Sequence, residues 1–166
     1  MNFQFYVEKL NHSDEYKNFL ESHKDSYPCS AFIIIDLENP TGNKFHIDFF
    51  DKLDSKFYSF EMENGVVLVP LDTVDTRVPS EIPLNHDFDF EEIKDMVINA
   101  MDNYGVTNTL QKIILSLQNK DGENCLVGTA FLSMLGLAKI SISLKDKKVT
   151  EFEKRSFFDI MKPTGK

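Results

Sequence analysis

His46, Asp48 and Cys125 are the side chains whose types and spacing come nearest to catalytic chemistry in this sequence. His46 and Asp48 alternate along a strand-like segment, so both point to the same face, where a carboxylate can orient an imidazole as a general base. Cys125 follows a turn and is a candidate nucleophile. No G-x-S-x-G motif is present. A small enzyme built from these dispersed residues is therefore one alternative, although such an alternation more often marks the solvated face of a strand.

Motifs for metals and cofactors are missing from the sequence. The four histidines occur singly, so no segment carries the H-x-x-x-H spacing of a metal site, and two cysteines are too few for a structural zinc site. The acidic run 86–92 imitates the start of a calcium-binding loop, but Glu92 and Ile98 stand where glycine and glutamate are required. Isolated glycines exclude a phosphate-binding loop. We predict no catalytic residues, no metal and no cofactor.

Charge and hydropathy limit the classes of partner. The chain has 166 residues, with 18 Lys and Arg against 27 Asp and Glu, and its net charge is −9. This charge repels a phosphate backbone, so nucleic acid is an unfavourable partner. No apolar stretch is long enough to span a membrane, and the first ten residues lack the pattern of a signal peptide. We expect a cytoplasmic protein with no membrane partner.

The apolar periodicity predicts two helices. Residues 13–24 carry apolar side chains at helical spacing after Ser13, which can cap the helix. Residues 90–104 form a longer amphipathic stripe, which begins after a capping box at Asp89 and Glu92 and ends at Gly105. Each predicted helix precedes four predicted strands. These strands lie at 31–37, 44–50, 56–62 and 66–71, and then at 109–118, 125–132, 137–144 and 149–154.

These elements predict an α+β fold in which antiparallel sheets pack against two helices. No crossover helix separates consecutive strands, so each group of four is an antiparallel meander. One interpretation is two similar lobes, each a helix plus a four-stranded meander, at residues 1–76 and 88–166 with a linker at 77–87. The other is one single domain over residues 1–166.

An aromatic patch in the first half is the candidate interface. Phe45, Ile47 and Phe49 occupy one face of the predicted strands, while further apolar side chains offer a second face that, if no element covers it, would be exposed. These candidate interface residues are Tyr58, Phe60, Phe50 and Met62. Acidic neighbours around this patch would favour a basic partner. Simple burial in the core is the alternative.

Basic side chains gather late in the chain and are interleaved with acids. A solvated hairpin tip is the ordinary explanation, and any nucleic-acid or anion contact would fall here. The residues are Lys139, Lys145, Lys147, Lys148, Lys154, Arg155 and Lys162.

Residues 90–160 resemble a PepSY-like module in element order: a helix, a strand, a turn with Asp121-Gly122, another strand and a closing hairpin. The turn 145–148 lacks the glycine usual in that family, and such domains generally occur outside the cytoplasm. The size and acidic character are also similar to those of type III secretion chaperones. These resemblances imply a non-enzymatic protein-interaction or inhibitory module whose partner is a protein or a second copy, with an effector-binding chaperone as an alternative.

Overall fold

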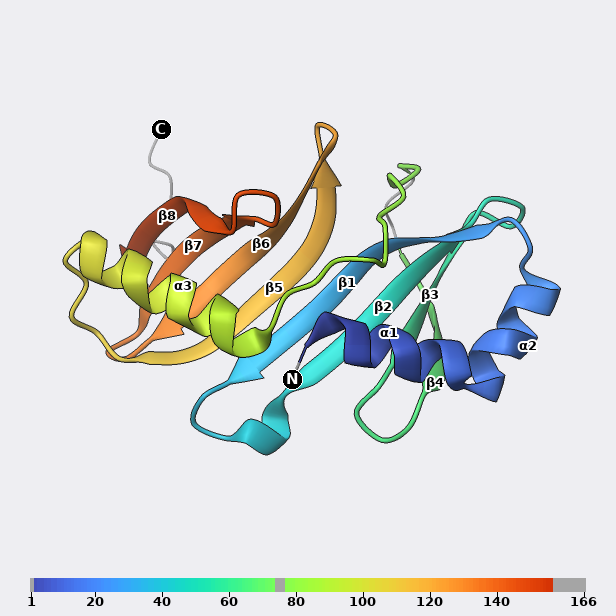
Figure 1. Cartoon of the computed structure of the whole chain (residues 1–166), viewed down its shortest axis with the longest axis horizontal. Helices are drawn as coiled ribbons and strands as arrows, with labels where there is room; N and C mark the ends of the chain where they lie inside the picture. The colour runs from blue at the N-terminus through green and yellow to red at the C-terminus, as the bar shows by residue number, and fades with distance from the viewer. Residues whose placement is uncertain (1, 74–76, 157–166) are drawn as a thin grey trace.

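The protein forms one eight-stranded antiparallel sheet with its helices on one side, as seen in a computed structural model that describes residues 2–73 and 77–156 (Figure 1). The helices are α1 (Phe3–His12), α2 (Asp14–Ser22) and α3 (Phe90–Asn103), with a short 3-10 turn η1 (Pro40–Gly42). The strands are β1 (Ser26–Asp36), β2 (Lys44–Asp51), β3 (Lys56–Glu61), β4 (Val67–Leu71), β5 (Leu110–Lys120), β6 (Glu123–Leu132), β7 (Gly136–Ser143) and β8 (Lys148–Ser156).

Two meanders meet at the centre of the sheet. The strand order is β4-β3-β2-β1-β5-β6-β7-β8, so the first strand of each group of four is the inner one. β1 and β5 pair antiparallel, with Ile33 opposite Leu115 and Ile34 opposite Ile114. The hydrogen-bonded ladder is therefore continuous across the middle of the sheet, and both groups of strands share one hydrophobic core.

The predicted fold class is wrong in its architecture. Separate sheets against two helices were expected, whereas one sheet and three α-helices are observed. Of the described residues, 46% are in β-structure and 24% in helices, so the fold is mostly β. The two groups of strands form one sheet because β1 pairs with β5. No local sequence pattern predicts this pairing. The division at 77–87 stays a prediction, although Ile82 within that segment is fully buried and donates its N–H to Pro28 O.

Local signals located most elements correctly. The predicted helix 90–104 is α3, and its capping box is present: Asp89 accepts from the helix backbone while the Glu92 side chain accepts from the Asp89 N–H. Gly105 ends the helix with a φ of +64°. All eight predicted strands are observed within a few residues of their expected bounds.

Two features at the start of the chain were not predicted. Helix α1 buries Phe3, Tyr6, Val7 and Leu10, whose spacing is that of one helical face. β1 begins at Ser26 rather than at residue 31, because it includes Pro28, which sequence patterns assign to a turn. A shift of the β1–β2 register just after Pro28 accommodates the proline in the strand.

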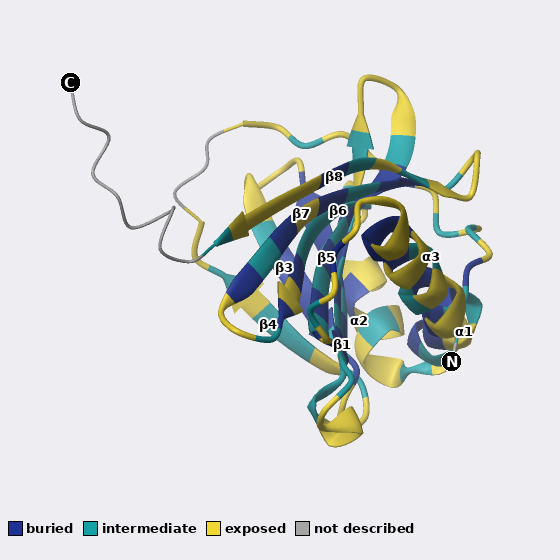
Figure 2. Cartoon of the chain, turned by 90° about the vertical axis from the view of Figure 1, so that its left-hand side faces the viewer, coloured by how far each residue is buried: buried dark blue, intermediate teal, exposed yellow. Residues whose placement is uncertain are grey.

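All three helices cover the same face of the sheet, as Figure 2 shows with the sheet seen nearly edge-on. Alternate strand residues face the helices and are buried; in β1 these are Ala31 and Ile33, both 0% exposed, and Ile35. They join buried residues of α1 and α3 in the core. No helix in the described part of the chain is both long enough and apolar enough to cross a membrane.

Candidate functional site

The four candidate interface residues are buried. Tyr58, Phe60 and Met62 lie in the main core, and Phe50 lies in a small buried cluster on the opposite face of the sheet. Helix α2 covers Phe60, because the Tyr16 ring packs edge-on against it with centroids 5.4 Å apart, whereas Phe50 is covered by the rings of Tyr27 and Phe57. The exposed aromatic patch anticipated from the sequence is therefore not formed by these residues, and their placement corresponds to the alternative of simple burial.

His46 and Asp48 share a face of β2 but not a hydrogen bond. His46 Nε2 lies 2.8 Å from Glu63 Oε1, and Asp48 Oδ2 accepts from Ser30 Oγ at 2.6 Å. The imidazole is thus held by the carboxylate that follows β3. The two residues do not form the dyad that their alternation allows.

Both thiols are buried, and Cys125 lies far from His46. Burial raises the pKa of Cys29 to about 12 and raises the pKa of Cys125. Cys125 lies on β6 and His46 on β2, with β1 and β5 between them. Three strand spacings correspond to about 14 Å, beyond direct proton transfer. The dispersed candidates are not brought together into one site.

A polar cluster that sequence patterns missed joins α2 to the turn after β2. His23 Nδ1 lies 2.6 Å from Asp51 Oδ2, and Tyr58 donates to Asp54 Oδ2 at 2.7 Å; we call these four residues the His23 cluster. Burial acts to raise the pKa of the Asp51 carboxyl, but the Leu53 N–H and the His23 imidazole outweigh it, and the pKa is lowered. No local sequence pattern predicts that His23 and Asp51 pair, because they are 28 positions apart in the chain.

Two groups in the described residues have donor atoms close enough for a metal ion. One comprises His23, Asp51 and Asp54; the other comprises His46, Glu61 and Glu63, and in each the ligand atoms lie within 4.8 Å of one another. Nitrogen and carboxylate oxygen suit a divalent cation. In the first group, the Asp51 oxygens already accept from Leu53 N–H and face His23. This arrangement is sufficient to explain the first group as a link between α2 and the sheet.

The face of the sheet opposite the helices is the more distinctive surface. No helix packs on it in the described part of the chain (Figure 2). Its centre, which we call the helix-free face, crosses β1, β5 and β6 and consists of Phe32, Ile34, Ile114, Ser116, Val127 and Thr129. All six are half-buried by their strand neighbours, and none belongs to the core. Antiparallel sheets usually present polar side chains to water, so an apolar centre departs from that pattern.

Ion pairs and acids surround the helix-free face. Asp36 and Lys112 pair at 2.8 Å at one end of the central strands, and Lys139 pairs with Glu151 at 2.8 Å on the β7–β8 side. On the β2–β3 side, Glu61 has no cationic partner in the described part of the chain. Lys44, opposite Ile34 in the β1–β2 register, is a cation on the same side, but Asp48 and Glu61 outnumber it. The charge beside the apolar centre is therefore on balance negative on that side.

Comparison with known proteins identifies a fold but no family. No family model and no curated protein matches the chain. One solved structure, described as a "putative lipoprotein" from Clostridium difficile 630, superimposes with a TM-score of 0.53 over 86% of this chain and 91% of its own, at 14% identity. At this identity the likeness shows a shared fold and carries no functional assignment.

Proposed function

We propose that this protein is a non-enzymatic module that binds another protein through the helix-free face of its sheet. The observation that supports the proposal is the apolar centre made by Phe32, Ile34, Ile114 and Val127 on a face that none of the described helices covers. Apolar patches of this kind, bordered by polar and charged groups, mark protein interaction sites.

The arrangement of the candidate catalytic groups favours binding over catalysis. His46 is engaged by Glu63, and Cys125 is a buried thiol with a raised pKa, so neither is poised as a base or nucleophile. The helix-free face, by contrast, is built on the central, hydrogen-bonded strands of the sheet. Surfaces held by such a hydrogen-bonded ladder bind with little loss of conformational entropy.

The charged residues beside the helix-free face indicate which charge the partner carries. Glu61 and Asp48 border the apolar centre on the β2–β3 side, and residues 1–83 carry most of the net negative charge of the chain. A partner with an apolar contact surface and basic side chains at one margin is complementary to this arrangement, and its association would slow as salt is added.

Site-specific photocrosslinking tests the proposal. Phe32 is replaced by the photoreactive residue benzoylphenylalanine, the protein is irradiated in the source cell, and adducts are identified by mass spectrometry. Phe5 on α1, 54% exposed on the helix side, provides the matched control. We expect a protein adduct from position 32 and none of the same species from position 5. Equal adducts from both positions, or none from position 32, would refute the assignment of the face.

A further inference from the structure

The two edges of the sheet differ in length and chemistry. β4 is a short edge of five residues that contains Pro70, which has no N–H to donate to an added strand. β8 has nine residues without proline and, among the described residues, pairs only with β7. Its outer side therefore presents backbone N–H and C=O groups that can receive a further strand.

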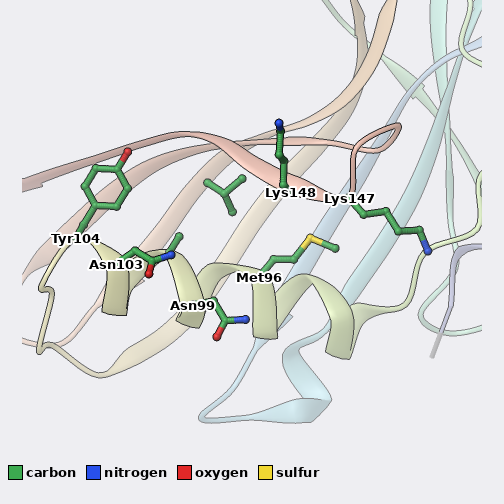
Figure 3. A pocket seen from close by; sticks show the side chains of 8 residues that line it. Met96, Asn99, Asn103, Tyr104, Lys147 and Lys148 are labelled. Carbon is green, nitrogen blue, oxygen red and sulfur yellow. The ribbon is translucent and has the colours of Figure 1, made fainter.

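A groove runs between this edge and helix α3, and Figure 3 shows its lining. Its volume is about 270 Å³. Met96, Ala100 and Val149 supply apolar surface, and the Tyr104 ring, stacked on Phe152 at 5.1 Å, stands at one end. The groove lies where a side chain from a strand added beside β8 would project toward α3.

The charged side chains along the β8 edge determine which charge an added strand can carry. Glu151 is paired with Lys139, and Glu153 is paired with Arg155 at 2.9 Å. Lys148, in contrast, is exposed at the mouth of the groove and has no hydrogen-bond or ionic partner in the described part of the chain. The unpaired Lys148 cation disfavours a basic side chain at this point of the edge and favours a carboxylate.

We propose that the β8 edge is a second interaction site, which accepts an extended acidic segment of a partner protein as a ninth strand. The segment places an apolar side chain in the groove over Ala100 and Val149 and a carboxylate beside Lys148. Backbone hydrogen bonds to β8 provide affinity, and the groove and the cation provide specificity. This site is distinct from the helix-free face and does not depend on it.

The probe is a seven-residue peptide, acetyl-Glu-Val-Glu-Val-Glu-Val-Glu-amide, titrated into the full chain and followed by amide NMR. We expect saturable shifts centred on β8 and on the groove-lining part of α3. The same peptide with lysine in place of each glutamate, and a version with proline in place of the central valine, should bind at least about fivefold more weakly. Shifts centred elsewhere, equal binding of the lysine peptide, or no binding at millimolar concentration would overturn the proposal.

Two pairs of exposed variants locate the contact. Lys148→Glu should weaken binding of the acidic peptide at least about fivefold, whereas Lys145→Glu in the neighbouring turn, with the same change of charge, should leave it within about twofold. Asn103→Trp should obstruct the groove and weaken binding about tenfold, whereas Asp102→Trp should not. Because these positions are exposed, the fold should persist. Equal effects within either pair would contradict the proposed site.

Discussion

The two faces of the sheet are built from the same strands, but helices pack on only one of them in the described part of the chain. On β1, Ile33 is 0% exposed under the helices, whereas its neighbour Ile34 is half-buried on a face that no helix in the described part of the chain covers. Aromatic side chains from α1, α2, β2 and β3 interlock on the covered face, with Phe49 and Phe60 centroids 5.5 Å apart. Apolar composition alone therefore does not identify a core, because each face of the sheet also needs an element that covers it.

The largest expected loss of stability comes from a charge placed in the core between α3 and the sheet. Val97 on α3 is fully buried, and Val97→Asp would leave an unpaired carboxylate in the core. We expect a loss of more than about 4 kcal/mol in the free energy of unfolding, measured by urea titration. Ile98→Asp, one position along and 37% exposed, is the control and should cost less than about 1 kcal/mol. Similar losses for both would mean that the face of α3 is wrongly assigned.

The next largest loss of stability is expected at Gly128, where the backbones of β5 and β6 lie close together. A Cβ at Gly128 would lie 1.9 Å from the carbonyl oxygen of Ile114, so Gly128→Ala forces β5 and β6 apart. We expect a cost of about 1–3 kcal/mol in thermal or urea unfolding. Thr129→Ala, on the helix-free face of the same strand, should change stability by less than about 0.5 kcal/mol. A neutral Gly128→Ala would show that the strands separate more easily than this geometry implies.

The His23 cluster ties α2 to the covered side and should have a pH signature. Asp51→Asn weakens the pairing with His23 at neutral pH, with an expected loss of about 1–3 kcal/mol. The folded-state pKa of Asp51 lies below its ordinary value, so its contribution is present above the unfolded pKa and disappears as pH falls through the folded pKa. Urea unfolding at pH 7 and at pH 3 should show the two proteins converging in acid. A constant difference would refute the ionic role of Asp51.

The smallest effect should come from His86, where the chain passes from the β4 side to α3. Its Nε2 is buried without a hydrogen-bond partner among residues 2–73 and 77–156, and burial lowers the pKa of the imidazole. The unfolded state therefore binds a proton more readily, and stability should fall as pH drops below about 6.5. His86→Gln should flatten the dependence of the unfolding free energy on pH between 7.5 and 5. His12→Gln, at an exposed position, is the control and should flatten it less. An unchanged slope would show that His86 is protonated in the fold without cost.

Sequence patterns predicted the elements but not their partners. The stripe of α3, its capping box and the Asn64-Gly65 turn are encoded within a few residues, so they could be predicted. The β1–β5 pairing joins positions about 80 residues apart. The β-branched and apolar run Ala31 to Leu37 suggests a strand covered on both faces. In residues 2–73 and 77–156, helices cover one face of that run only. This difference moved the candidate interface from Tyr58 and Phe60 to the centre of the sheet.

The most direct test of the account compares one substitution on the two sides of the sheet. Ile114→Arg places a charge on the helix-free face, and Ile98→Arg places the same charge on the exposed side of α3. Both variants and the parent are used to capture partners from the source cell, with quantification by mass spectrometry and with melting temperatures measured in parallel. We expect all three proteins to melt within a few degrees of one another, and Ile114→Arg alone to lose the protein captured by the parent. Retention of that protein by Ile114→Arg, or its loss by both variants, would contradict the assignment of the helix-free face.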